Sequence, residues 1–447
     1  MRWLADFLQH EFPFYRYNAN ALSRPPLLAD FNEDKQTMNR YPMVFAPRSW
    51  RPALNPWAVS VLRPLRKRRI EREVKLHTID VHGIEYLRAA LNQGQQIMIA
   101  PNHPSHADPF AIYEACEQAN TLCHIMAAWH VFAKHSAIMR KCLQWHGCFS
   151  IDRESNDLTA FRDAVAVLRT RPEPLVIFPE GDIYHCNDRV TPFREGAAAI
   201  AIAAARRSER MAVVIPTAIR YRYVDDPTPH IEHTLGLMEQ RILWRPRPGL
   251  PIVERIRAIG DAVLGLKELE FYGHSLHGPM PERIRRLTEF ILSKLEEGHQ
   301  LEPLDSVPRR VKQLRQTVLT KLHDQRTALE SRTELRRHLD EAFLVLQLFS
   351  YPGDYLDIDS PPIERIAETI DKMEEDVLQI KTASIRCRRS AIIEFGEALE
   401  VPTTKSRDAT SRLTEAIESR VLELIMKGGC NAAPRAACNP TSMLSGP

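Results

Sequence analysis

The chain has 447 residues, of which 44% are hydrophobic and 26% charged, and its formal net charge is +3. This apolar fraction is sufficient for a large core. The nearly balanced charge excludes the strongly basic composition typical of nucleic-acid-binding proteins, so no nucleic-acid partner is expected. Eight cysteines are scattered without a CxxC pair, which favours reduced thiols inside a cell over a disulfide framework. Because no apolar run approaches the roughly 18 residues that span a bilayer and no signal-peptide pattern is present, we expect a cytoplasmic protein without a transmembrane helix.

The first 75 residues are expected to form an N-terminal extension. Residues 1–50 show little apolar periodicity, whereas the apolar residues 55–62 lead directly into the basic cluster 63–69. Trp and aliphatic side chains beside Arg and Lys are typical of helices that lie in a membrane interface, with the cations on lipid phosphates. An ordinary helix packed on the domain, with a solvated charged end, explains the pattern equally well. The first alternative predicts peripheral attachment to the inner face of a membrane.

Residues 76–228 alternate between short apolar runs and amphipathic segments, which predicts an α/β domain. The expected strands are residues 77–82, 97–100, 124–128, 148–151, 174–178 and 213–220. The expected helices are residues 84–92, a segment that starts at 110, and residues 131–144, 157–169 and 193–206. We therefore expect a mixed sheet flanked by helices.

The C-terminal half is mostly helical by its apolar period, and a lone strand follows the helices. The expected helices are residues 282–295, 307–347, 362–384 and 410–426. Residues 388–401 favour a strand, which needs a partner sheet, so we expect it to return to the α/β domain. The expected units are a helical insertion, the returning strand, a C-terminal helix and a disordered tail, at residues 229–385, 386–402, 403–427 and 428–447. The role of the insertion stays open between a lid, a dimer contact and a membrane dock.

The loop at residues 101–109 follows a predicted buried strand and precedes a predicted helix. It holds His103 and Asp108 with four residues between them, in a stretch interrupted by prolines. A carboxylate on the same tight loop can fix the imidazole tautomer and stabilise the imidazolium that forms when the histidine takes a proton from a hydroxyl. A loop histidine beside a helix N-cap aspartate explains the same residues, because Asp favours that position.

Three further stretches end strands or open helices in the same domain. Arg153 follows the strand at 148–151 and could bind a phosphate through two parallel hydrogen bonds, or form a surface salt bridge. Glu180 and Gly181 end a strand in a Phe-Pro-Glu-Gly turn. Backbone N–H groups there could hold a substrate oxygen, and a plain β-turn is the alternative. Arg194 lies at the start of an Ala-rich helix, whose N-terminus favours anions.

Four ordered blocks of the sequence resemble the motifs of the glycerolipid acyltransferase family (PlsC-like), whose members acylate glycerol phosphate or lysophosphatidate. The blocks are Asn102-His103-(four residues)-Asp108, Gly147-x-Phe149-x-Ile151-x-Arg153, Phe178-Pro179-Glu180-Gly181 and Val214-Ile215-Pro216. The resemblance covers about residues 76–223, and the strand at 388–401 resembles one that usually follows the fourth block closely. It implies transfer of a fatty acyl group from an acyl-CoA or acyl carrier protein thioester to a hydroxyl of lysophosphatidate, glycerol-3-phosphate or a lysophospholipid.

The resemblance also implies a role for each matched residue. His103 would be the general base and Asp108 would orient and polarise it, without an acyl-enzyme, a metal or a resident cofactor. Arg153 would bind the phosphate of the acceptor, in a pocket shaped by Glu180 and Gly181. The residues expected to bind substrate are Asn102, Ser105, Arg153, Glu180, Gly181 and Arg194.

Two features depart from the family pattern. Gly181 is followed by Asp182, where the family commonly has Thr and a basic residue, and an acid there would repel a phosphate. Either the acceptor is not a simple phosphomonoester, or Asp182 turns away, or Arg189 or Arg194 compensates. His106 adds a second histidine to the first block. Because no cysteine or further histidine cluster supplies four metal ligands, we expect a loop residue near the pocket and no metal.

Two other classes of function stay open on the sequence. A catalytically idle membrane-associated scaffold could keep the same fold, although the intact His103–Asp108 pair argues against it. A thioester or lysolipid hydrolase could use His103 to activate water, although the chain lacks the Gly-x-Ser-x-Gly elbow of a nucleophilic serine.

Overall fold

The computed structural model describes residues 48–430, apart from residues 154–156, 325–327, 352, 381, 405 and 407. Most of the predicted N-terminal extension, residues 1–47, lies outside this range, as does nearly all of the predicted disordered tail, residues 431–447. The last described helix, α15 (Ala409–Cys430), begins and ends within a few residues of the helix predicted from the sequence.

A mixed sheet of eight strands forms the centre of the α/β domain, as the sequence predicts. Seven strands follow the order β1-β7-β6-β2-β5-β3-β4, and β8 pairs with β6 beside β7. β1 and β7 are parallel to each other and run against the other five, which are parallel among themselves. The strands are β1 (Leu76–His82), β2 (Gln96–Pro101), β3 (His124–Ala128), β4 (Cys148–Ile151), β5 (Leu175–Val176), β6 (Ala212–Tyr223), β7 (Arg389–Phe395) and β8 (Leu399–Glu400).

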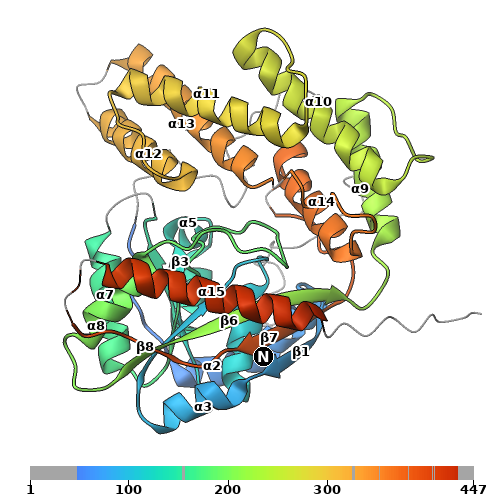
Figure 1. Ribbon diagram of the computed structural model, residues 1–447. Coiled ribbons are helices and arrows are strands. Elements are labelled where there is room, and N and C mark those ends of the chain that lie inside the picture. Colours follow the sequence, from blue (N-terminus) through green and yellow to red (C-terminus); the bar gives the residue numbers. More distant parts are fainter. Residues whose placement is uncertain are drawn as a thin grey trace, which may run out of the picture.

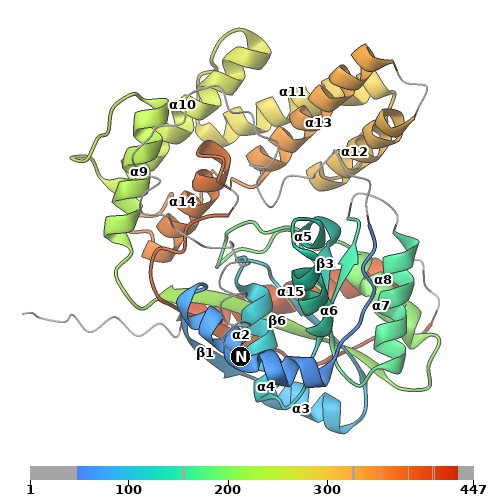
Figure 2. The ribbon, with the colours of Figure 1, turned by 180° about the vertical axis from the view of Figure 1, so that it is seen from behind.

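Helices cover both faces of this sheet (Figures 1 and 2). One face carries α7 (Leu158–Thr170), α8 (Gly196–Ala205) and α15, whose apolar side chains form one core with β2, β4 and β6. The opposite face carries α2 (Pro56–Arg72), α3 (Ile84–Asn92) and α4 (Asp108–Gln118). The central strand β2 is buried along its whole length because both of its faces are covered.

The single helix predicted at residues 131–144 is wrong, because the chain forms two helices there. α5 (Trp129–Ala133) ends before Ser136, and Ser136 caps the following α6 (Ala137–Trp145) by accepting a hydrogen bond from the Met139 backbone N–H at 3.3 Å. Serine is a preferred N-cap, and its hydroxyl satisfies one of the free donors of the new helix. The apolar period continues across this break, so periodicity alone did not reveal it.

A block of helices, here called the insertion (residues 224–388), joins β6 to β7 and lies against the edge of the sheet where β2 ends (Figure 1). The helix predicted at 307–347 is also two helices, because α12 ends at His323 and α13 begins at Leu329. The predicted returning strand is β7, which pairs with β6 and β1. The helices are α9 (Thr228–Ile242), α10 (Ile252–Tyr272), α11 (Met280–His299), α12 (Val307–His323), α13 (Leu329–Phe349) and α14 (Ile363–Val377).

Candidate active site

The loop between β2 and α4 brings His103 and Asp108 together. Nδ1 of His103 lies 2.6 Å from Oδ2 of Asp108, and that oxygen also accepts the Ser105 backbone N–H at 3.0 Å. Asp108 is fully buried, and its other oxygen accepts the Tyr221 hydroxyl of β6 at 2.6 Å. Asp108 does not cap α4, because Ala107 is the N-cap and makes no side-chain capping bond. The carboxylate therefore holds the imidazole and the loop, which is the arrangement a general base requires.

Asn102 fixes the start of this loop to the neighbouring strand. Its side-chain amide donates to the Ile219 carbonyl at 3.0 Å and accepts the Ile219 backbone N–H at 2.7 Å. These two bonds replace the ladder bonds that β2 can no longer make after it ends at Pro101. The Asn102 side chain is fully buried against β6, so in this structure it anchors the start of the loop to that strand.

Glu180 links the His103 loop to the loop that follows β5. One carboxylate oxygen accepts the His103 backbone N–H at 2.7 Å, and the other accepts the Thr191 backbone N–H at 3.0 Å. Phe178 stacks on the His103 ring with centroids 4.0 Å apart. Burial raises the pKa of Glu180 from 4.5 to about 7, although the His103 and Thr191 bonds oppose the shift. Glu180 and Phe178 thus set the position and tilt of His103.

Asp182 lies between Arg153 and Arg194 and pairs with both of them. Arg153 donates to both Asp182 and the Gly181 carbonyl, and Arg194 donates to the second Asp182 oxygen at 3.1 Å. Burial alone would raise the pKa of Asp182, but the two arginines outweigh it and hold the pKa below its usual value. Gly181 has a φ of +78°, and a Cβ there would come within 2.6 Å of Arg194, so only glycine fits this turn.

Of the compensating cations that the sequence suggested, Arg194 contacts Asp182, whereas Arg189 pairs with Asp354 of the insertion through two bonds of 2.8 Å. The cluster of Asp182 with Arg153 and Arg194 lies at the turn that follows β5. The same loop is bonded to the His103 backbone through Glu180. Two arginines that share one carboxylate form a cationic group in which an anion could take the place of that carboxylate.

Comparison with known families adds one finding. Residues 78–220, about a third of the chain, match the family model Acyltransferase. This region is an acyltransferase domain. The match contains all four sequence blocks together with the strands β2 to β5 and most of β6, which supports an acyltransferase activity for the protein. Comparison with curated proteins yields no matching sequence.

Two residues that hold the site of the acyltransferase domain were missed in the sequence. Tyr221 donates to Asp108, and the Asn187 side chain bonds both the N–H and the carbonyl of Tyr221 at 2.8 and 2.6 Å. Burial and the neighbouring Asp108 raise the pKa of Tyr221, so its hydroxyl stays a donor. Strand parity could have indicated Tyr221, because it lies on the same face of β6 as Ile219 and Ile215.

The insertion packs over the loops of the acyltransferase domain. Asp188 pairs with Arg365 at 2.7 Å, the Asn187 backbone N–H donates to Glu368 at 3.1 Å, and Tyr184 makes an edge contact with Phe349. A further contact places Trp129 of α5 in one apolar cluster with residues of α12 and α13. The His103 side chain is 15% exposed.

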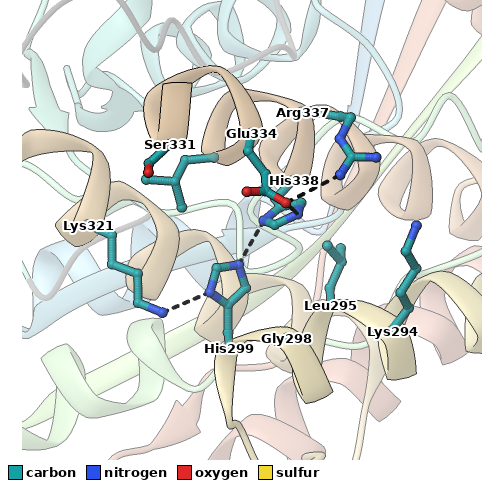
Figure 3. Close-up of a pocket in the computed structure, with 10 residues that line it drawn as sticks. Lys294, Leu295, Gly298, His299, Lys321, Ser331, Glu334, Arg337 and His338 are labelled. Carbon is teal, nitrogen blue, oxygen red and sulfur yellow. Dashed lines mark hydrogen bonds and ion pairs between the residues drawn. The ribbon is translucent and has the colours of Figure 1, made fainter. Parts of the chain in front are cut away.

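A cavity of about 480 Å³ lies within the insertion itself (Figure 3). All of its lining residues belong to α11, α12 and α13, and none belongs to the acyltransferase domain. In it, Nε2 of His299 lies 3.0 Å from Nδ1 of His338, and Nζ of Lys321 lies 3.0 Å from the other ring nitrogen of His299. The cavity is therefore separate from the site around His103.

Proposed function

We propose that this protein transfers a fatty acyl group from an acyl-CoA or acyl carrier protein thioester to a hydroxyl of a glycerolipid acceptor. The observation that carries the proposal is the His103–Asp108 contact of 2.6 Å inside a domain of the acyltransferase family. Asp108 holds Nδ1, which leaves Nε2 as the ring nitrogen that is proposed to face the substrate.

The mechanism follows from this geometry. Nε2 of His103 takes the proton of the acceptor hydroxyl while the alkoxide oxygen attacks the thioester carbonyl carbon, and Asp108 stabilises the imidazolium that forms. The tetrahedral intermediate then collapses with cleavage of the carbon–sulfur bond, and the thiolate takes the proton back from His103. The products are an ester and a free thiol, and no acyl-enzyme, metal or resident cofactor takes part.

The acceptor subsite is proposed at Arg153, Arg194 and the Gly181 turn, close to Asp182. An acceptor phosphate that reaches Arg153 competes with Asp182, which bonds the same guanidinium. This competition disfavours an acceptor that is held by its phosphate alone. Lysophosphatidate, glycerol-3-phosphate and a lysophospholipid are the acceptors that we propose to test, and among them the competition favours one whose other groups also bind. Asn102, Ser105 and Glu180 contribute by holding the loops in place.

The central experiment compares wild type with His103→Ala, using labelled acyl-CoA and acyl carrier protein thioesters against a panel of lysophospholipids and glycerol phosphate. General-base loss lowers turnover by about 10²- to 10⁴-fold, while the matched control His233→Ala, an exposed histidine of α9, retains wild-type turnover. Undiminished transfer by His103→Ala contradicts the proposal. Release of free fatty acid without an acceptor would instead identify a hydrolase. If the wild type shows neither acyl transfer nor hydrolysis, the protein is a scaffold.

The acceptor subsite is tested by two opposite variants. Arg153→Ala raises the Michaelis constant of a phosphate-bearing acceptor far more than that of the acyl donor, because only the acceptor contacts the guanidinium. Asp182→Asn removes the competing carboxylate and lowers the same constant. Equal effects of Arg153→Ala on donor and acceptor would remove the phosphate role from this residue.

Membrane contact is proposed for one face of α2. Trp57, Val61 and Leu65 form an exposed apolar stripe that continues into Arg68 and Arg72, all at three- or four-residue steps on one side of the helix. Trp57 is 75% exposed, whereas Val59 and Ile70 on the opposite side are packed in the core. Among the described residues, no helix is both long and apolar enough to cross a membrane. The packed side of α2 agrees with the alternative of an ordinary helix, and the membrane contact of the exposed side is a proposal.

The structure changes which cations of α2 should be tested. Arg66 is buried and pairs with Glu114 and Glu117, and Arg69 pairs with Glu73, so neither is available to a lipid surface. The double variant Arg68→Gln/Arg72→Gln should weaken sedimentation with anionic vesicles in low salt, and Trp57→Ala should weaken it in high salt as well. Unchanged binding in both would leave α2 as a structural helix.

A further inference from the structure

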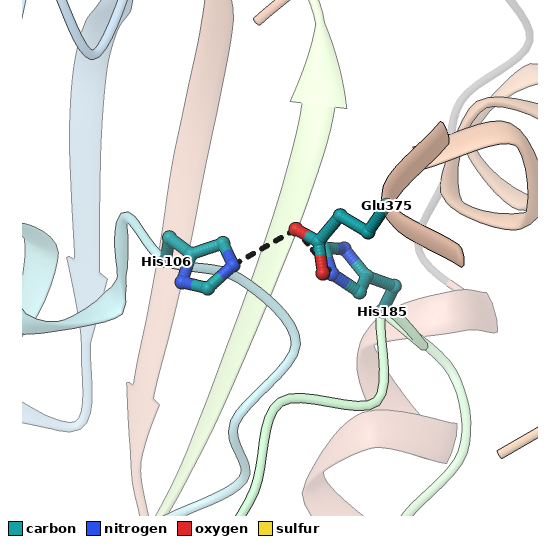
Figure 4. A group of neighbouring side chains, drawn as sticks. All are labelled: His106, His185 and Glu375. Carbon is teal, nitrogen blue, oxygen red and sulfur yellow. Dashed lines mark hydrogen bonds and ion pairs between the residues drawn. The ribbon is translucent and has the colours of Figure 1, made fainter. Parts of the chain in front are cut away.

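We propose that His106, His185 and Glu375 form a binding site for one divalent first-row metal ion, with Zn²⁺ as the best match. Their ligand atoms all lie within 4.8 Å of one another. The three residues come from three separate parts of the fold: the loop after β2, the loop after β5 and the end of α14 in the insertion (Figure 4). The inference is independent of the acyl-transfer reaction.

The spacing of the ligand atoms matches a small metal ion. Nε2 of His106 lies 3.0 Å and Nε2 of His185 lies 3.4 Å from the same Oε1 atom of Glu375. Two ligands at about 2.1 Å from a tetrahedral ion are about 3.4 Å apart, so the His185–Glu375 contact has the length of an edge of a zinc tetrahedron and the His106–Glu375 contact is shorter. In Figure 4 the two rings approach the carboxylate from different directions, which leaves the carboxylate between them.

The chemistry of the donors also suits such an ion. Two imidazole nitrogens and one carboxylate oxygen are a common ligand set of zinc sites that keep one open position for water. The Ala383 backbone N–H donates to Oε1 of Glu375 at 3.0 Å and helps to fix the orientation of the carboxylate. Three protein ligands therefore need only one water to complete four-coordination.

Two further observations concern His185. Its side chain is 5% exposed, and its Nε2 is a buried nitrogen whose 3.4 Å contact with Glu375 lacks hydrogen-bond geometry. Its backbone has a φ of +52°, a left-handed conformation that non-glycine residues adopt rarely. Nε2 of His185 is thus a buried nitrogen close to a buried carboxylate, at a position where a cation bound between them would contact both groups.

The second close histidine pair of the protein provides an internal comparison. His299 and His338 are as close as 3.0 Å, but Lys321 places a cation 3.0 Å from the other nitrogen of His299. The nearest acidic contact recorded for this pair, between His338 and Glu334, measures 3.9 Å. A cation beside the pair and no tightly placed carboxylate disfavour metal there, so histidine proximity alone does not define the site.

A metal bound at His106, His185 and Glu375 would clamp the insertion to the acyltransferase domain. His106 lies three residues after His103, and His185 precedes the run of contacts that joins residues 187–189 to the insertion. The ion would therefore fix α14 over the loop that carries the proposed base. This predicts a stabilising role in the first instance, since metal that binds only the folded state raises its stability.

The experiment uses the full-length protein, stripped with EDTA, desalted and titrated with ZnCl₂. Wild type should bind one Zn²⁺ more per chain than His106→Ala or Glu375→Gln, measured by elemental analysis and calorimetry, and zinc should raise its melting temperature by a few degrees. Cobalt substituted for zinc should give visible absorption that both variants lose. The matched control His338→Ala should bind zinc as wild type does.

Each outcome decides the proposal. Loss of one equivalent in both ligand variants, with circular dichroism showing that they are folded, establishes the site. Equal zinc content in wild type, His106→Ala and Glu375→Gln overturns it and leaves a metal-free hydrogen-bonded contact between the insertion and the loops. Loss of zinc in His338→Ala alone overturns it as well, because it would place the ion in the other histidine pair.

Discussion

Buried carboxylates occur in both parts of this protein, but they face different partners. In the insertion, consecutive helices are joined by Glu–Arg pairs with two hydrogen bonds each, and each arginine is the fourth residue of its helix. The pairs are Glu239–Arg255, Glu268–Arg283 and Glu296–Arg310. Around the proposed base, Asp108 and Glu180 accept hydrogen bonds from backbone N–H groups, a phenol and an imidazole instead.

The pKa directions follow this difference. Burial would raise the pKa of Glu239, but its bonds to Arg255 and the Arg247 backbone outweigh burial and lower it. Glu180 accepts hydrogen bonds from the backbone N–H groups of His103 and Thr191 instead, and burial raises its pKa to about 7. The three glutamates that pair with these arginines therefore hold consecutive helices together, whereas Glu180 joins two loops and has a raised pKa. Four substitutions test this division.

The largest effect is expected for Asp108→Asn. The amide keeps the size of the side chain but cannot stabilise the imidazolium, so turnover should fall by about 10²- to 10⁴-fold, which corresponds to about 3–5 kcal/mol of transition-state stabilisation. Steady-state kinetics together with urea unfolding check this. A loss of turnover that only accompanies unfolding would contradict the assignment of Asp108 to the reaction.

The next effect concerns stability and not activity. Glu239→Gln leaves Arg255, which is 2% exposed, without its charge partner, and should cost about 3–5 kcal/mol in the free energy of unfolding. The double variant Glu239→Leu/Arg255→Leu should recover most of this loss, because two apolar side chains leave no buried charge. Turnover per folded molecule should stay at the wild-type value in both, and a selective loss of turnover would break the comparison.

A third experiment measures pH dependence at Glu180. The folded state keeps the Glu180 proton up to about pH 7, whereas the unfolded state releases it near 4.5. Between these values the folded state binds more protons, so the contribution of Glu180 is fully present below pH 4.5 and falls by about 3 kcal/mol as the pH rises to 7. The stability of wild type relative to Glu180→Gln should decline over this window, and a flat difference would exclude the raised pKa.

The smallest effect is expected for Tyr221→Phe. Loss of the hydroxyl removes one hydrogen bond to Asp108, worth about 0.5–1.5 kcal/mol, so kcat should fall about 3- to 10-fold. The Michaelis constants of donor and acceptor should not change, because Tyr221 positions Asp108 and touches neither substrate. A rise in a Michaelis constant at constant kcat would show that the residue contacts substrate instead.

Much of the fold could be predicted because its strands appear in the sequence as short apolar runs and its helices as amphipathic segments. Strand β3 and helix α3 match their predicted bounds, and the lone strand near 390 had to pair with a sheet. Helix breaks were harder to predict, since the apolar period runs through Ser136 and from α12 into α13 without a glycine or proline to mark the change. Strand β5 shortened to two residues because the chain turns at Pro179 to bring Glu180 under His103.

The candidate site was predictable in its local part only. His103 and Asp108 are five residues apart, and a tight loop brings them together whatever the rest of the chain does. Tyr221 and Glu375 reach the same loop from positions more than a hundred residues away. Strand parity places Tyr221 on the inner face of β6 but does not pair it with Asp108, and nothing in the sequence places Glu375 beside His106. The local loop thus predicts the contact between His103 and Asp108. The residues that surround this pair depend on contacts between distant parts of the chain.

The way the insertion is attached has a consequence for engineering. It leaves β6 after Tyr223 and enters β7 at Arg389, and these two residues face each other in the antiparallel ladder. The Val224 backbone N–H donates to the Arg388 carbonyl at 2.9 Å, and Asp225 pairs with Arg388 just beyond. In topological terms β6 and β7 are a hairpin whose turn has been expanded into six helices. A short glycine-containing turn could therefore replace the whole insertion without changing the strand order, giving a minimal version of the enzyme with open loops around His103.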